Sequence, residues 1–275
     1  MVGGLAIRRA AATLAADHEA RPGASGVPLV FLHAGVADRR MWRSQLAAFA
    51  SAHPVLAYDR RGFGETRVVQ PQAHAQVDDL WAAMDAARLP SAVLVGCSQG
   101  GRIAIDAALA QPRRVLGLVL VAPAVSGAPE AGAYPPEVKQ RVDAYDAAEA
   151  AGDIDRLNEV EARVWLDGVL GEAGRVQGPV RRLFLAMNGI ALRAGEVGRA
   201  IDPPSAWGRL DRLRKPVLVA WGTLDFPHLQ DRCAALAAAI PGAQSLVIEG
   251  AGHLPNLDQP ATFDAALAAF VGGRG

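Results

Sequence analysis

"SAVLVGCSQGGRIAIDAALA", residues 91–110, joins an apolar run to a helical pattern through a cluster of glycines with one serine at its centre. Gly96 and Gly100 stand two residues before and two residues after Ser98, and Gly101 follows. Such small neighbours suit a turn so tight that its central residue is held in strained backbone geometry. The stretch therefore predicts a strand, a sharp turn with the Ser98 hydroxyl at its tip, and a helix.

The same alternation of short apolar runs and helical patterns continues along the chain. The predicted strands lie within residues 27–35, 53–62, 91–98, 115–124, 215–225 and 243–253. The predicted helices lie at about 41–51, 75–89, 100–111, 228–240 and 258–271. Strands that are apolar on both faces and separated by helices imply an α/β fold with a mostly parallel sheet covered on both faces. Reactive groups gather at the carboxyl ends of the strands in such a sheet.

The interval 126–212 interrupts this alternation. Its patterns are helical, near 136–151, 153–167, 178–193 and 204–213, with turn signals such as "GEAG" and "DPP" between them. We therefore predict a core domain of residues 1–125 and 213–275, and a helical cap, or lid, of residues 126–212 inserted between two strands of the sheet.

Composition favours a globular protein and does not point to nucleic acid or a membrane as a partner; the expected partner is a small-molecule substrate. The 275 residues are 51% hydrophobic and 20% charged, and 28 basic residues balance 28 acidic ones. This balance offers no basic excess for binding nucleic acid or an anionic membrane. The longest apolar run, 115–125, is too short to span a bilayer, and Arg8 and Arg9 interrupt any secretory signal.

The two cysteines and the scattered histidines indicate neither a disulfide framework nor a metal site. Cys97 and Cys233 have no neighbouring ligand at metal-binding spacing, which favours a reduced, cytoplasmic setting. We expect no metal and no organic cofactor, and the oligomeric state is left open.

Three residues that follow predicted strands have the chemistry of nucleophilic catalysis. Ser98 needs a base to become a nucleophile, and His253 in "GAGH" and Asp225 in "WGTLD" supply a base and its orienting acid. The amide of Gln99, at the start of the helix, points toward charge that develops beside Ser98. Alone, Asp225 could be a turn or capping residue and His253 a loop residue; their order and placement together favour catalysis.

These motifs resemble the α/β-hydrolase superfamily, in its lidded branch of esterases, lactonases and carbon–carbon bond hydrolases. The resemblance covers nearly the whole chain and includes "LHAG" at 32–35, "RRMW" at 39–42 and "YDRRGFGET" at 58–66, where Thr66 replaces the usual serine. The family usually has His-Gly where this chain has His33-Ala34.

The resemblance also implies roles for the loop residues. It implies that the amide of Gly35, with Val36 as the alternative, is the second oxyanion donor beside that of Gln99. His33 is expected to shape its loop. Asp59 and Arg61 are expected to tie loops together.

The resulting hypothesis is a serine hydrolase that cleaves a small ester or lactone through an acyl-enzyme on Ser98. A carbon–carbon bond hydrolase of ring-cleavage products, a cofactor-free perhydrolase and a ligand-binding receptor on the same fold remain alternatives. Large apolar side chains in and near the cap are candidates for lining the substrate pocket, although each could instead pack in the core. They are Trp42, Trp165, Phe184, Met187 and Trp207.

Overall fold

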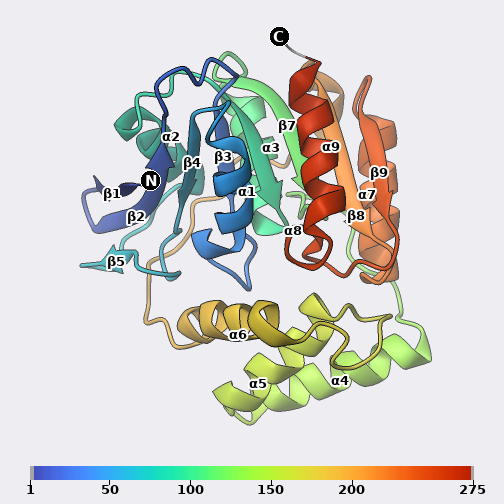
Figure 1. The fold of residues 1–275 in the computed structure, drawn as a ribbon. Helices are drawn as coiled ribbons and strands as arrows, with labels where there is room; N and C mark the ends of the chain where they lie inside the picture. Colours follow the sequence, from blue (N-terminus) through green and yellow to red (C-terminus); the bar gives the residue numbers. More distant parts are fainter. Residues whose placement is uncertain (1–2, 274–275) are drawn as a thin grey trace.

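A single sheet of nine strands runs through the part of the chain that the computed structural model describes, residues 3–273 (Figure 1). The strands are β1 (Gly3–Arg8), β2 (Ala12–Glu19), β3 (Leu29–Leu32), β4 (Val55–Tyr58), β5 (Arg67–Val68), β6 (Ala92–Cys97), β7 (Val115–Val121), β8 (Val217–Gly222) and β9 (Gln244–Ile248). Their order is β1-β2-β4-β3-β6-β7-β8-β9, with β5 beside β2. From β4 to β9 every pairing is parallel, which confirms the predicted fold class.

Helices cover both faces of this sheet. Those of the core are α1 (Arg43–Phe49), α2 (Gln76–Ala86), α3 (Gln99–Ala110), α7 (Pro227–Ala239), α8 (Pro255–Asp258) and α9 (Pro260–Gly272). Helices α1 and α9 pack on one face, and α2, α3 and α7 pack on the other (Figure 1). Strands β3, β4, β6 and β8 are buried along their whole length, as expected for strands covered on both sides.

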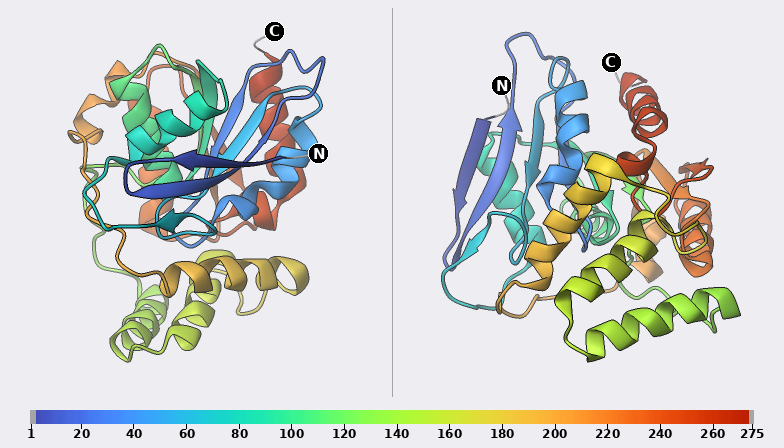
Figure 2. Two further views of the ribbon diagram at one scale, coloured as in Figure 1. Left: turned by 90° about the vertical axis from the view of Figure 1, so that its left-hand side faces the viewer. Right: turned by 60° about the horizontal axis from the view of Figure 1, so that its bottom comes forward.

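The segment between β7 and β8 is helical. It contains α4 (Pro136–Ala150), α5 (Ile154–Glu161), a π-helix η2 (Ala162–Leu166), α6 (Gly178–Leu192) and a short 3-10 helix η3 (Trp207–Arg212). We call α4, α5, η2 and α6 the cap helices. They lie together beyond the carboxyl ends of the parallel strands (Figure 2). The exact domain boundaries at 126 and 212 stay a prediction.

The N-terminal hairpin of β1 and β2 was not expected from the sequence. In β2 the buried residues Ala12, Leu14 and Ala16 alternate with half-buried ones, which is the period of a strand. Alanine favours strands only weakly, so this alternation gives a faint signal. Antiparallel pairing of β2 with both β1 and β4 holds the segment in place.

No helix within residues 3–273 is both long and apolar enough to cross a membrane.

Candidate active site

Ser98 occupies the turn between β6 and α3 with φ of 51° and ψ of −114°. This is a left-handed backbone conformation that L residues rarely adopt. The turn is possible because glycines allow close backbone contacts: a Cβ on Gly96 would lie 2.4 Å from the carbonyl oxygen of Gly100. The Ser98 side chain is half-buried at the carboxyl end of β6. The local geometry is that of the sharp turn the sequence predicts.

Asp225 and His253 form a buried pair at the same edge of the sheet. Asp225 follows β8 and is completely buried, and its Oδ1 accepts a hydrogen bond of 2.8 Å from the amide of Phe226. His253 follows β9, is 3% exposed, and places Nδ1 at 2.6 Å from Asp225 Oδ2. A carboxylate accepts only, so Nδ1 carries the proton, which leaves Nε2 free to act as a base.

The Ser98 turn and the His253 loop lie against each other. The thiol of Cys97, the residue before Ser98, is 3.7 Å from the carbonyl oxygen of His253. Within residues 3–273 the Ser98 hydroxyl makes no hydrogen bond, and bonds between nucleophile and base are often long in enzymes without substrate. Burial raises the pKa of the Cys97 thiol, which keeps this neighbour of Ser98 protonated.

The two predicted oxyanion donors are also neighbours. Gly35 lies in the loop after β3, and a Cβ built on it would be 2.9 Å from Gln99 Nε2. The amide of Gln99 begins α3 and has no acceptor within the helix. Val36 is half-buried beside Gly35, so the choice between their amides stays a prediction.

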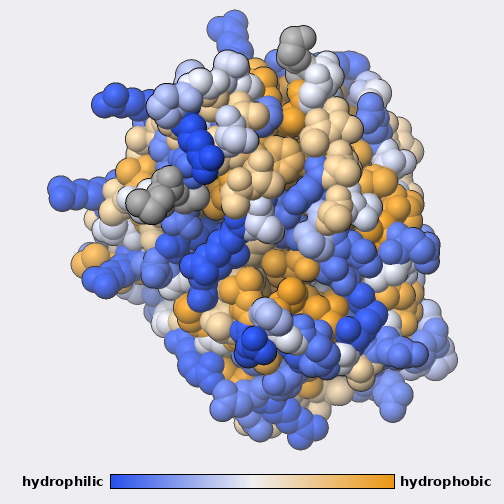
Figure 3. Space-filling view, in the orientation of Figure 1, coloured by the Kyte–Doolittle hydropathy of each residue, from blue (hydrophilic) through white to orange (hydrophobic). Residues whose placement is uncertain are grey.

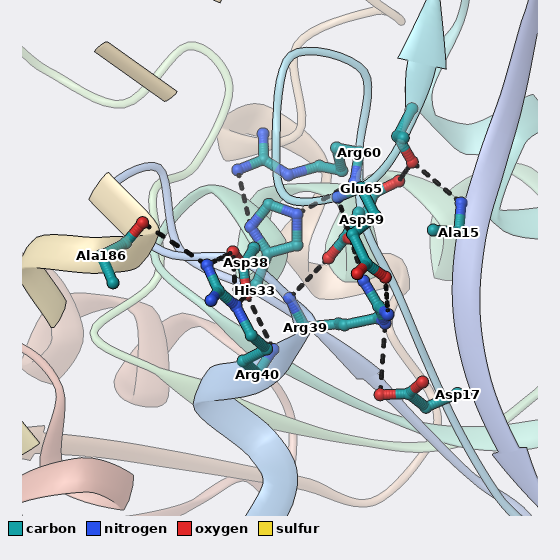
Figure 4. Close-up of polar contacts among 11 residues, drawn as sticks. Ala15, Asp17, His33, Asp38, Arg39, Arg40, Asp59, Arg60, Glu65 and Ala186 are labelled. Carbon is teal, nitrogen blue, oxygen red and sulfur yellow. Dashed lines mark hydrogen bonds and ion pairs between the residues drawn. The ribbon is translucent and has the colours of Figure 1, made fainter. Parts of the chain in front are cut away.

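Buried polar contacts fix the loops after β3 and β4 (Figure 4). Asp59 accepts hydrogen bonds of 2.8 Å from the amides of Arg39 and Glu65, and it also pairs with the Arg39 guanidinium. The Thr66 hydroxyl donates to the Asp59 carbonyl at 2.7 Å, so the threonine supplies the hydroxyl expected of the usual serine.

Arg61 and His33 complete these loops. Arg61 pairs with Asp79 of α2 through two hydrogen bonds of 2.8 and 3.1 Å. His33 is fully buried, and burial followed by the charge of Arg60 holds its pKa well below the usual value, so its ring is neutral. These are contacts that shape loops, which is the role the sequence predicts for both residues.

The predicted pocket residues lie in different environments. Trp165, in η2, is half-buried with its ring centroid 4.7 Å from that of His253. Trp42, Phe184 and Met187 are completely buried in a cluster that joins the core to the cap helices. Trp207 is half-buried and packs on the opposite face of the sheet. Their contact with substrate stays a prediction.

Two cavities border the cap helices. One of about 650 Å³ lies between α6 and the loop 62–68, and one of about 270 Å³ lies between α4, η2 and the start of α7. The second is lined by Trp165 and by aromatic and polar residues that the sequence analysis missed, among them Tyr134, Phe226 and His228. Figure 3 shows apolar side chains gathered where the cap helices meet the core. Phe226 directly follows Asp225, which was the available sequence signal.

Comparison with known proteins identifies the class. The family model described as alpha/beta hydrolase fold matches residues 27–260. The chain therefore belongs to the α/β hydrolase family, and it is a hydrolase.

Three relatives show the range of this similarity. The chain is 31% identical over 248 residues to a pimeloyl-[acyl-carrier protein] methyl ester esterase of Cronobacter sakazakii, covering 88% of this chain and 92% of that one. It is 28% identical over 265 residues to the dihydrolipoyllysine-residue acetyltransferase component of an acetoin cleaving system of Cupriavidus necator, covering 92% of this chain but only 66% of that protein's length. The solved structure of Est816, described as an N-acyl homoserine lactone degrading enzyme, is 26% identical with a TM-score of 0.71, covering 97% of this chain and 100% of that one.

Proposed function

We propose that the protein hydrolyses a small carboxylic ester or lactone through an acyl-enzyme on Ser98. The observation that carries the proposal is the 2.6 Å contact between His253 Nδ1 and Asp225 Oδ2, made beside a strained serine turn. One similar protein is named for cleaving a methyl ester and another for degrading a lactone, which supports this substrate class.

The proposed reaction has two halves with the same base. His253 Nε2 takes the proton of Ser98 as its oxygen bonds to the substrate carbonyl carbon. The amides of Gly35 and Gln99 stabilise the oxyanion, and the leaving alcohol departs with the proton. Water, deprotonated by His253, then attacks the acyl group, and Ser98 recovers its proton as the acid is released. Asp225 keeps the imidazole in the required tautomer throughout.

Known magnitudes indicate how much each part contributes. One oxyanion donor contributes about 3 kcal/mol to lowering the barrier. General acid–base catalysis adds about 10²- to 10⁴-fold in rate. The cycle uses only side chains, backbone amides and water, and the substrate is a small molecule.

The buried free thiols Cys97 and Cys233 support a cytoplasmic location.

The test compares Ser98→Ala and His253→Ala with Ser44→Ala, an exposed serine control. We expect the first two to fold and to lose turnover of a p-nitrophenyl ester by about 10³-fold or more, and the control to keep it. A fluorophosphonate should label Ser98, as located by mass spectrometry, and a label on another residue would contradict the mechanism. Parallel assays with a lactone, a vinylogous diketone and peroxide separate the alternative activities, and tight ligand binding without turnover would favour a receptor.

A further inference from the structure

Arg60, which follows β4, is a buried guanidinium with an unusual set of partners. It is 6% exposed, it stacks at 4.3 Å on the ring of Phe63, and its Nε has no hydrogen-bond partner. The neighbouring arginines each pair with a carboxylate: Arg39 with Asp59, Arg40 with Asp38, and Arg61 with Asp79. Within residues 3–273, no carboxylate pairs with Arg60. A buried charge without a counter-ion is costly, so its contacts require an explanation.

The first contact fixes the peptide that carries the Gly35 amide. Arg60 Nη2 donates to the carbonyl oxygen of Ala34 at 3.0 Å. In a trans peptide the carbonyl and the following N–H point in opposite directions, and no described peptide bond is cis. Holding the Ala34 oxygen therefore fixes the direction of the Gly35 N–H, and a charged donor on that oxygen polarises the peptide and strengthens the N–H as a donor.

His33 supports the same carbonyl, and Figure 4 shows its ring beside Arg60. The backbone amide of Arg60 donates to His33 Nε2 at 3.0 Å, so Nε2 is the unprotonated nitrogen. The proton is then on Nδ1, which donates to the Ala34 oxygen at 2.8 Å. Two donors thus converge on one carbonyl: the Arg60 guanidinium, and the His33 ring, whose tautomer is set by the Arg60 backbone amide.

The second contact reaches Gln99. Arg60 Nη1 donates to Gln99 Oε1 at 2.7 Å. The Gln99 side chain lies directly over Gly35, since a Cβ there would be 2.9 Å from Gln99 Nε2. One guanidinium therefore bridges the two loops whose amides are the proposed oxyanion donors. Burial lowers the pKa of Arg60 to about 10, so it stays charged at neutral pH.

We propose that Arg60 is a positioning residue of the oxyanion hole, which holds the Ala34–Gly35 peptide and Gln99 together and directs its unneutralised charge toward the developing oxyanion. This inference rests on the proposed function. It predicts an effect on the transition state and not on ground-state binding, because Arg60 acts through the Ala34–Gly35 peptide and Gln99 and its charge matters most when the oxyanion develops. It also predicts that a variant without the Arg60 charge loses activity but not stability, because removing an unpaired buried charge also removes its desolvation cost.

The test uses Arg60→Met, which keeps the length of the side chain without charge or donors, and Arg60→Lys, which keeps the charge without the forked donors. The matched control is Arg114→Met, because Arg114 also stacks on an aromatic ring (Trp81, at 4.8 Å) and donates to backbone carbonyls, but at the opposite end of the sheet. For each variant, kcat and KM are measured with a p-nitrophenyl ester. The inhibition constant of a boronic acid, which becomes a tetrahedral anion on the serine, and the thermal midpoint are measured beside them.

We expect Arg60→Met to lower kcat by about 10- to 100-fold with KM changed less than about threefold. The inhibition constant of the boronic acid should rise by a factor similar to the loss in kcat. The thermal midpoint of Arg60→Met should equal or exceed that of the wild type. The kcat of Arg60→Lys should lie between those of Arg60→Met and the wild type, and the control Arg114→Met should keep wild-type kcat. A kcat within about twofold of wild type, or an effect confined to KM with unchanged boronic acid inhibition, overturns the proposal.

If Arg60→Met does not fold, Gln99→Met, which keeps the backbone amide, is measured in its place. We then expect a loss of about 3- to 10-fold in kcat, and a kcat within about twofold of wild type overturns the proposal. Failure of the proposed function is recognised separately, as a wild-type protein that a fluorophosphonate does not label at Ser98.

Discussion

Ser98 holds its φ of 51° because two backbones approach each other closely around it. A conformation of this kind costs on the order of 1–3 kcal/mol and persists only where the surroundings enforce it. Gly100 contributes most clearly, since a Cβ on it would lie 2.2 Å from the carbonyl oxygen of Leu32 in β3. The turn that carries Ser98 therefore packs directly against the strand that leads to Gly35.

We predict that Gly100→Ala destabilises the protein by about 2 kcal/mol or more, because the added methyl group meets backbone that cannot move without shifting β3. Urea unfolding at equilibrium measures this change. Gly132→Ala is the control, since a Cβ there meets nothing within 4 Å. Equal stability of the two variants would show that the contact with β3 is not tight.

At the scale of elements, the loop between β9 and α8 is attached to the cap helices. The amide of His253 donates to the carbonyl of Trp165 in η2 at 3.2 Å. Asp258 accepts from the amide of Gly252 at 2.9 Å and pairs with Arg175, which follows the π-helix, through bonds of 2.9 and 2.5 Å. The position of the His253 imidazole thus depends on a segment of the cap.

We predict that Asp258→Asn lowers kcat by about 3- to 10-fold, because losing the charged pair loosens the loop that positions His253. Arg175→Gln should cause a similar loss, and the double variant should lose little more than either, because both changes remove one interaction. Steady-state kinetics measures all three. Asp143→Asn breaks an exposed pair with Lys139 and serves as the control. Fully additive losses would show that the pair does not act as a unit.

The elements that the sequence predicts best are those with a clear apolar pattern, which in the central strands β3, β4, β6 and β8 comes from burial on both faces. All six predicted strands and the helices α1, α2, α3, α7 and α9 lie where continuous apolar runs and 3.6-residue periodicity place them. The hairpin of β1 and β2 was missed because its alanines carry weak strand preference and its stability comes from pairing with β4. The π-helix η2 was predicted as ordinary helix, because one shifted hydrogen-bond register leaves no mark in apolar periodicity.

The candidate site also has a part that the sequence predicts and a part that it does not. The order Ser98, Asp225, His253 is readable because each residue follows a strand and has a distinctive local motif. The bridge made by Arg60 is not readable, because it depends on β3 lying between β4 and β6, which brings the loops after all three strands together. The local sequence around Arg60 does not indicate which strands are neighbours in the sheet.

At the scale of the whole molecule, the cap helices contain their own buried polar group. Glu161 of α5 is 5% exposed, and its carboxyl group accepts hydrogen bonds from Tyr145 at 3.1 Å and from Asn188 of α6. Within residues 3–273 no ion pair involves it. Burial raises the pKa of Glu161, and the hydrogen bonds offset this only in part.

We predict that Glu161 makes the protein less stable as pH rises. Because its pKa is higher in the folded than in the unfolded state, the folded state binds more protons between the two values, and the free energy of unfolding falls as pH increases through that window. Glu161→Gln should therefore raise the thermal midpoint relative to wild type more at pH 8 than at pH 4. Glu159→Gln, at an exposed neighbour, is the control. An effect of the same size at both pH values would contradict the prediction.

The path of the chain between β7 and β8 has a consequence for how such enzymes diversify. These strands are parallel hydrogen-bonded neighbours, with Leu118 opposite Val217 and Val121 opposite Ala220, so the polypeptide leaves the sheet at the carboxyl end of β7 and rejoins it beside that strand, at the amino end of β8. A longer, shorter or unrelated segment inserted between β7 and β8 leaves the hydrogen bonds between these strands intact. The segment that covers the strand ends can therefore diverge in length and sequence, as long as its replacement still supports the loop that carries His253.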